Sequence, residues 1–325
     1  MPTERAIVDA YTRRALLLLR VGRGLGQDAA AELRKLGKEL RAILGGAEIN
    51  ALGRRELTAL LREVDAAIAQ RYASIAEQQA EELANLAEIE AQWAAPQHRT
   101  RIAPAIAAGL LVLGLPLARH WQRQAEGLTD RVAAAVRSAA TTGQDASALL
   151  AAIVGQGRPG RERGGLMEGA RQQATTLAAT SAHAAAYEAR QRAWAARGVR
   201  YLKWHAILDP HTTIGCAARA GLIYTTDFQP VNHDIPLDRP PPRHFNCRSL
   251  LAPMDSRFEP PGDGQDTYSE SLDDWLKRQP EMMQDELLGP TRAALWRAGK
   301  LDARGLLGRD GAVLSVAELA RVLPG

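Results

Sequence analysis

Potential zinc ligands are concentrated in residues 204–247 of this 325-residue chain. Both cysteines lie there, together with four of the seven histidines. Structural zinc is held tetrahedrally by thiolate, imidazole and carboxylate groups. Cys216, His244 and Cys247 supply three groups of the right kind, and the His-x-x-Cys spacing of the last two suits adjacent ligands. We therefore predict a structural zinc site built on these three residues.

The fourth ligand of this site stays open at the level of sequence. Asp209, His211 and His233 all carry suitable donor atoms, and the first two lie nearest to Cys216 in the chain. The sequence contains no CxxC knuckle, which would have identified further ligands. Our predicted set is Cys216, His244 and Cys247 with Asp209 or His211, and zinc is the one cofactor that the sequence indicates.

The same residues allow other interpretations. Both thiols could be small buried apolar groups, or they could form a Cys216–Cys247 disulfide, which a reducing compartment disfavours. A catalytic alternative is a metal-dependent nuclease that uses His233 and His244. The zinc knuckles that often frame such nuclease sites are absent, so we expect a protein that is not an enzyme.

Three short elements of this region resemble the phage Mu F-like minor head proteins. They are WHxxLDPxTxxxC over residues 204–216, AGLIY over residues 220–224 and RPPPRHFNCRSLLAP over residues 239–253. The tail from Thr267 to Leu301 is similar to the helical extension that many members carry. The positions that carry the resemblance are Trp204, Asp209, Cys216, Gly221, Pro242, His244, Asn246, Cys247 and Arg248.

The chain departs from the family pattern at two places. Ser249 stands where members often have a second cysteine after Cys-Arg. Thr212, Thr213 and Gly215 stand where some members carry a cysteine partner for Cys216. In a zinc site, a histidine would have to compensate for these missing thiolates.

The resemblance implies a structural protein of a tailed-phage head. Members are minor head or head-morphogenesis proteins, encoded near the portal gene and associated with the portal or the inner capsid. The implied partners are the portal protein and the capsid or procapsid, and the implied location is the virion. We expect synthesis in the bacterial host cytoplasm, because the N-terminus carries charge throughout and has no signal-peptide pattern.

Composition favours helices. Hydrophobic residues make up 46% of the chain but aromatic residues only 5%, and long segments are rich in Ala and Leu. Strands favour β-branched and aromatic residues, so we predict an α+β fold that is predominantly helical. Two cysteines in a chain of this length exclude a disulfide-stapled scaffold.

The clearest periodic segment predicts one long amphipathic helix over residues 54–94. Apolar residues recur there at steps of three and four, with Gln79 as an interruption. In the segment before it, the glycines of residues 22–26 predict a break between two helices. The apolar stripe consists of Leu57, Leu61, Val64, Ile68, Tyr72, Ile75, Leu83, Leu86 and Ile89.

Five regions follow from these patterns. Residues 1–154 are a helical region, 155–165 a flexible connector rich in Gly and Arg, and 166–198 an Ala-rich helix. The core module of the resemblance follows over 199–255, with strands expected near 200–207, 221–225 and 247–252. Short helices are expected over 256–325, where Ser271 with Asp274 and Ser315 with Glu318 have the capping-box spacing.

Residues 102–118 form an uncharged segment between two arginines. Its length is at the lower limit for a membrane-spanning helix, and Pro104 and Pro116 shorten the uninterrupted part. We therefore predict a buried helix and no stable membrane insertion. An ejected, membrane-active protein is the alternative that this segment leaves open.

Positive charge is concentrated in residues 101–200. The whole chain has a formal net charge of +4, whereas this part holds 13 Arg and no Lys against 6 Asp/Glu. Arginine suits phosphate recognition, so this part is a candidate contact for phage DNA. A solvated helix face is the simpler interpretation.

Overall fold

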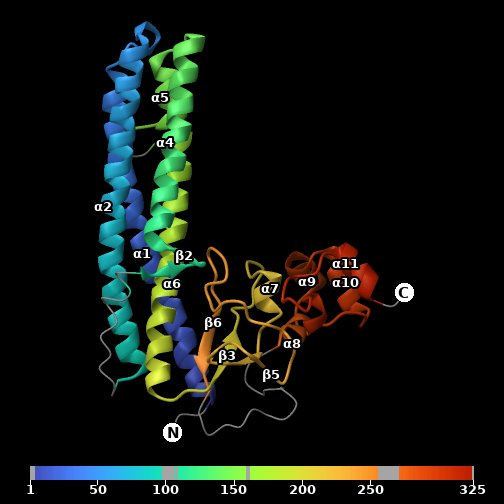
Figure 1. The fold of residues 1–325 in the computed structure, drawn as a ribbon. Coiled ribbons are helices and arrows are strands. Elements are labelled where there is room, and N and C mark those ends of the chain that lie inside the picture. Colours follow the sequence, from blue (N-terminus) through green and yellow to red (C-terminus); the bar gives the residue numbers. More distant parts are fainter. Residues whose placement is uncertain (1–3, 97–105, 107–108, 159–161, 255–270, 324–325) are drawn as a thin grey trace. The chain divides into compact units, whose positions relative to one another are not determined.

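The computed structural model describes residues 4–96, 106, 109–158, 162–254 and 271–323. The chain is 65% helical with small antiparallel sheets, which confirms the predicted α+β class (Figure 1). The long helices are α1 (Glu4–Gly45), α2 (Arg54–Ala94), α4 (Leu117–Thr142) and α6 (Gly165–Ala196), with the shorter α5 (Ala146–Ile153) and the 3-10 turn η1 (Ile49–Ala51). The amphipathic helix predicted over 54–94 is therefore confirmed.

The chain forms two compact units. The first comprises Met1–Leu18, Ile89–Thr100 and Ala186–Gly325, and the second comprises Leu19–Glu88 and Arg101–Ala185. In its described residues the second unit consists of helices, one hairpin and an isolated β-bridge, and its core includes the fully buried Leu36, Ile68 and Val132. The first unit contains the four-stranded sheet and the C-terminal helices.

α1 runs without interruption through the glycine-rich stretch, so the predicted break at residues 22–26 is wrong. These glycines allow close packing inside the second unit. A Cβ on Gly22 would lie 2.9 Å from Cα of Ala179, and one on Gly26 would lie 2.7 Å from Cγ2 of Thr175. Both contact residues belong to α6, so the absent side chains let the two helix backbones approach.

This packing predicts opposite outcomes for neighbouring glycines. Gly26→Ala should lower the free energy of unfolding by about 1–3 kcal/mol, because the new methyl group overlaps α6. A Cβ on Gly24 would meet no atom within 4 Å, so Gly24→Ala should raise stability by about 0.5–1 kcal/mol through helix propensity. Urea unfolding of both variants checks the pair, and equal effects would contradict this view of the helix contact.

The uncharged segment around residue 110 forms a hairpin where its structure is described. β1 (Leu111–Val112) pairs antiparallel with β2 (Leu115–Pro116), and α4 begins at Leu117. The helix predicted over 102–118 is thus wrong for 111–116, because the turn takes positive φ at Leu113 and Gly114. Residues 102–105 and 107–108 lie outside the described part. None of the helices found in the described residues is long and apolar enough to cross a membrane.

The sheet of the first unit has the strand order β5-β4-β3-β6. The three predicted strands are confirmed as β3 (Tyr201–His205), β4 (Ile223–Thr225) and β6 (Leu250–Pro253). β5 (Pro230–Val231) was not predicted from the sequence. It lies at the sheet edge, where Pro230 needs no backbone donor for a further strand. The short helix α7 (Ile214–Ala217) lies between β3 and β4 in the chain.

The C-terminal part packs on the same hydrophobic core as this sheet. Its elements are α8 (Leu272–Lys277), α9 (Glu281–Leu288), α10 (Pro290–Arg297), η2 (Arg304–Leu306) and α11 (Val316–Val322). The predicted caps form, since Ser271 accepts from the Asp274 backbone and Ser315 makes a full capping box with Glu318. The tail residues 267–270 of the family resemblance lie outside the described part.

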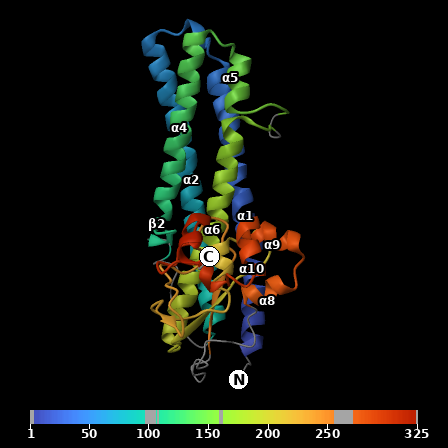
Figure 2. The ribbon, with the colours of Figure 1, turned by 90° about the vertical axis from the view of Figure 1, so that its right-hand side faces the viewer.

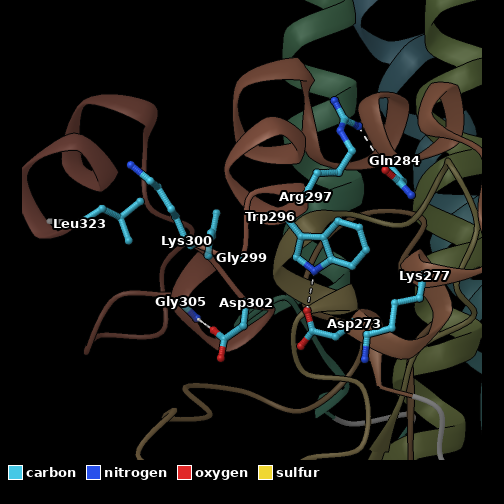
Figure 3. Close-up of a pocket in the computed structure, with 11 residues that line it drawn as sticks. Asp273, Lys277, Gln284, Trp296, Arg297, Gly299, Lys300, Asp302, Gly305 and Leu323 are labelled. Atoms are coloured by element: carbon cyan, nitrogen blue, oxygen red, sulfur yellow. Dashed lines mark hydrogen bonds between the residues drawn. The ribbon is translucent and has the colours of Figure 1, made fainter. Parts of the chain in front are cut away.

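A pocket opens within this C-terminal part and is lined by residues of α8, α9, α10 and η2, by the turn after α10 and by Leu323 (Figure 3). Inside it the Trp296 indole donates to Oδ1 of Asp273 at 2.8 Å. Burial raises the pKa of the Asp273 carboxyl, although Trp296 and the Ala303 amide oppose the shift. Asp273 thereby connects α8 to α10 and to the segment before η2.

Candidate metal centre

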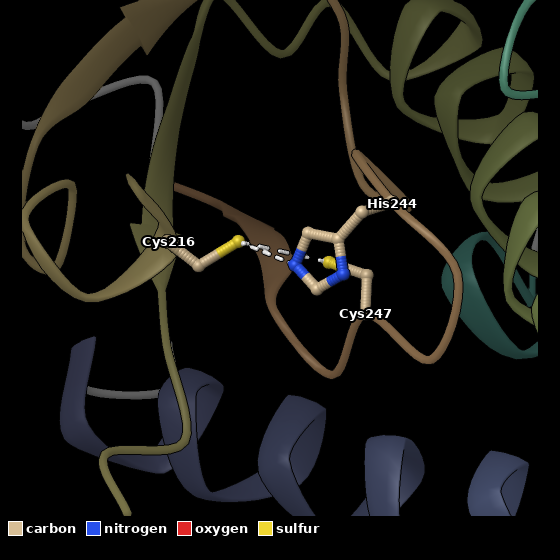
Figure 4. Close-up of side chains that lie close together, drawn as sticks. All are labelled: Cys216, His244 and Cys247. Atoms are coloured by element: carbon tan, nitrogen blue, oxygen red, sulfur yellow. Dashed lines mark hydrogen bonds between the residues drawn. The ribbon is translucent and has the colours of Figure 1, made fainter. Parts of the chain in front are cut away.

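Three of the predicted zinc ligands come together in the first unit. The ligand atoms of Cys216, His244 and Cys247 all lie within 4.8 Å of one another (Figure 4). The Cys216 Sγ lies 3.3 Å from Nε2 of His244 and 3.9 Å from the Cys247 Sγ. No other such group of three His, Cys or acidic side chains occurs among the described residues.

The sheet and α7 hold the first ligand. Trp204 of β3 is fully buried, and its indole Nε1 donates to the carbonyl of Cys216 at 3.1 Å. The backbone of Trp204 also pairs with Gly221 and Leu222, so the chain returns along β3 directly after α7. Gly221 has φ +85°, a conformation that favours glycine. Trp204 and Gly221, two positions of the family resemblance, therefore fix where Cys216 lies.

A tight turn presents the other two ligands. The Cys247 amide donates to the carbonyl of His244 at 3.1 Å, which closes the turn. Asn246, inside the turn, has φ +58°, a left-handed value that asparagine tolerates better than most residues. The predicted closing strand begins at Leu250 and so anchors the turn to β3 through the β3–β6 ladder.

The ring of His244 is oriented as a metal-binding histidine requires. Its Nδ1 lies 2.8 Å from the carbonyl of Phe245, which can only accept, so Nδ1 carries a proton. The other nitrogen, Nε2, faces the Cys216 Sγ and the Thr213 hydroxyl. Histidine ligands of metals usually donate their second ring N–H to such a carbonyl or to a carboxylate.

The surroundings favour a thiolate at Cys216. A hydrogen bond from Cys247, followed by those from His244 and from the Thr213 and Ser249 hydroxyls, lowers the pKa of the Cys216 thiol against the opposing effect of burial. The hydrogen bond to Cys216 raises the pKa of His244. Both cysteines are 2% exposed. A buried thiolate attracts a cation, and zinc binds thiolate rather than thiol.

Two of the three ligand separations fit a tetrahedral zinc ion. Standard Zn–S and Zn–N lengths give edges of about 3.8 Å between two sulfurs and about 3.6 Å between sulfur and nitrogen. The distances of 3.9 Å and 3.3 Å found here are close to those edges. Cys216, His244 and Cys247 are therefore suitable as three ligands of a zinc ion, and Thr213 and Ser249 line the same small pocket as Cys216 and His244.

The structure does not bring Asp209 into this cluster. Both of its carboxylate oxygens accept from the guanidinium of Arg248, with Nη1 at 2.5 Å from Oδ2. It also accepts from the His211 amide at 2.9 Å and from the Thr212 hydroxyl at 3.1 Å. The ion pair of Asp209 and Arg248 thus connects the loop after β3 to the segment before β6. His211 lines the small pocket beside the cluster, outside the three-residue group.

Asp209→Asn should weaken the first unit by about 1–3 kcal/mol, because the guanidinium loses its charged partner. Arg248 lowers the pKa of the Asp209 carboxyl, so this stabilisation is full above about pH 5 and is lost as the pH falls through the lowered value. The stability gap between wild type and variant should therefore close in acid. Urea unfolding at several pH values measures this stability difference, with Asp234→Asn at an exposed position as the control. A difference that does not change with pH would contradict the ion pair between Asp209 and Arg248.

His233 lies away from the cluster, and backbone groups use both of its ring nitrogens. Nε2 lies 2.8 Å from the carbonyl of Ile223, and Nδ1 accepts from the Ile235 amide at 3.2 Å. Its ring also packs edge-on against Tyr224. These contacts leave no free nitrogen for a metal or for proton transfer. His233 connects β4 to the loop that follows β5.

Arg219 is a structural residue that the sequence reasoning missed. It is fully buried and donates to the carbonyls of Gly215 at 2.7 Å, Pro236 at 3.3 Å and Gly311 at 2.7 Å. It thereby joins the segment of Cys216 to the C-terminal part of the same unit. One arginine near a cysteine gives no sequence signal, because its three acceptors lie far apart in the chain.

Comparison with known proteins identifies the region that contains this site. Residues 130–252 match the family model described as phage Mu protein F like protein. No curated protein and no solved structure matches the chain. The match covers less than half of the chain, and it includes β3, α7, β4, β5 and all three cluster residues. It confirms the resemblance that the motifs indicate: over residues 130–252 this chain is similar to the phage Mu F-like family.

Proposed function

We propose that this protein is a minor head protein of a tailed bacteriophage, an assembly component that associates with the portal or the inner capsid. The observation that carries the proposal is the family match over residues 130–252. The structure supports this proposal, because motif residues such as Trp204, Asp209 and Arg248 connect the short strands and turns within residues 130–252. The protein would act as a virion component rather than as a catalyst.

Zinc would have a structural part in this function. Bound by Cys216, His244 and Cys247, it would cross-link α7 to the turn before β6, two segments that only short elements support. Its coordinate bonds would hold these two segments together in a module that is otherwise stabilised by a small sheet. Within the arginine-rich residues 101–200, Arg158 and Arg163 in the loop between α5 and α6 are the proposed contacts with phage DNA.

Co-expression with the portal protein encoded beside this gene tests the assembly role. We expect the two proteins to co-purify, and the chain to sediment with procapsids that contain the portal. Procapsids that form without the portal separate the two partners, since association with them would indicate the inner capsid. Failure to bind portal or either procapsid at any salt concentration would overturn the proposal.

A further inference from the structure

One face of α1 in the second unit is cationic and free of acidic residues. Arg20, Arg23, Arg34 and Lys38, here called the α1 stripe, are all exposed. At about 100° per residue they lie within roughly 60° of one another around the helix. The acidic residues of this part of α1, Asp28, Glu32 and Glu39, lie on a different side.

The charges of the α1 stripe have no counterpart in the described part of the chain. None of its four side chains makes an ion pair or hydrogen bond there, whereas the neighbouring acids do: Glu32 and Glu39 bind Arg71 of α2 at 2.9 and 3.0 Å. Like charges three or four residues apart destabilise a helix slightly. The stripe therefore opposes folding, and an external polyanion would relieve that repulsion.

The loop between α5 and α6 extends this surface. Arg41 of α1 lies 3.4 Å from the Glu162 carboxylate, and a Cβ on Gly37 would contact Val154 and Met167 at the two ends of the loop. Arg158 and Arg163, exposed on the same loop, are thereby held near the Lys38 end of the stripe. Figure 2 shows the described residues of this loop, on either side of 159–161, projecting from the helices between α5 and α6.

The arginines of α4 are arranged differently. Arg119, Arg123, Arg131 and Arg137 are also exposed, but Glu126 and Asp130 lie among them on the helix. Arg119 pairs with Glu126 at 3.7 Å. The positive charges of α4 therefore do not form an uninterrupted face. Arg158 and Arg163, which also belong to the charge excess of residues 101–200, lie in the loop between α5 and α6.

We propose that the α1 stripe, with Arg158 and Arg163, binds the phosphate backbone of double-stranded DNA without sequence preference. From Arg20 to Lys38 the stripe spans about 27 Å, over which duplex DNA carries roughly 16 phosphate charges. The stripe contains no aromatic side chain, so it offers no platform for stacking unpaired bases, and a duplex is the better fit. This inference rests on the proposed function only for the identity of the duplex, which would be the packaged phage genome.

Binding of fluorescent duplex DNA to the full chain, titrated at several salt concentrations, tests the surface. The test variant carries Arg20→Gln, Arg23→Gln, Arg34→Gln and Lys38→Gln. The matched control removes four exposed charges from α4: Arg119→Gln, Arg123→Gln, Arg131→Gln and Arg137→Gln. We expect the test variant to bind ~10-fold or more weakly at 0.1 M salt, with the slope of log K against log salt reduced by about 1 per residue removed. The α4 control should stay near wild type.

Several outcomes would overturn this inference. They are an α1 variant that binds as wild type does, an α4 variant that loses as much affinity, a preference for single strands, and a wild-type chain that binds no DNA at low salt. Circular dichroism confirms that each variant is folded. Sedimentation with procapsids is measured in parallel, because normal sedimentation without DNA binding would reject the surface and leave the assembly role intact.

Discussion

Cys216→Ser is expected to abolish zinc binding and to destabilise the first unit. The purified wild type should contain close to one zinc per chain, and the variant close to none, because serine supplies no thiolate to complete the cluster with His244 and Cys247. Where free zinc is about 1,000 times the Kd, its loss lowers the free energy of unfolding by about 4 kcal/mol. Metal analysis and urea unfolding with and without a chelator measure both effects.

Two controls make this result specific. His211→Ala, beside the cluster but outside it, should keep its zinc. A chelator should destabilise the wild type and leave Cys216→Ser unchanged, since that variant has no zinc to lose. A wild type purified without zinc that also fails to bind added zinc would refute the site, and so would a Cys216→Ser variant that retains a full equivalent.

Local patterns predicted the elements well where local forces decide them. Periodicity predicted α2 over its observed length, from residue 54 to residue 94. The three main strands and both helix caps of the C-terminal part were also predicted. These features depend on residues a few positions apart, which a sequence displays directly.

Contacts between distant segments escaped prediction. The glycines at 22 and 26 suggested a helix break, because their reason lies in α6, about 150 residues away. The apolar stripe of α2 was extended to Ile89, which is 57% exposed, while the neighbouring Glu90 is fully buried. At the candidate metal centre, residue types identify the three residues that come together, but they also offer Asp209, as an alternative to His211, for the fourth ligand, because its partner Arg248 cannot be identified from spacing.

Glu90 is a position where substitution should strongly destabilise the first unit. Its carboxylate is fully buried between two arginines: Oε1 lies 2.7 Å from Nε of Arg14, and Oε2 lies 2.6 Å from Nη2 of Arg190. The Arg190 guanidinium lies over the rings of Tyr11 and Trp93, at 5.4 and 5.2 Å from their centroids. Arg190 is itself 4% exposed, so it has little access to water.

Glu90→Gln should therefore lower the free energy of unfolding by about 3–5 kcal/mol. The amide keeps the shape of the side chain but leaves buried guanidinium charge without an anion, and removing one partner of a buried pair has this magnitude. Glu77→Gln, an exposed change on the same helix, should stay within about 0.5 kcal/mol of wild type. Urea unfolding followed by circular dichroism compares the two.

A second substitution separates lost charge from lost packing. If unpaired charge causes the loss, Arg190→Met added to Glu90→Gln should recover part of it, because the double variant buries one guanidinium fewer. If packing against Tyr11 and Trp93 is what matters, the double variant should be weaker than either single one. A Glu90→Gln loss below about 1 kcal/mol would mean that water reaches this carboxylate in solution, contrary to its complete burial here.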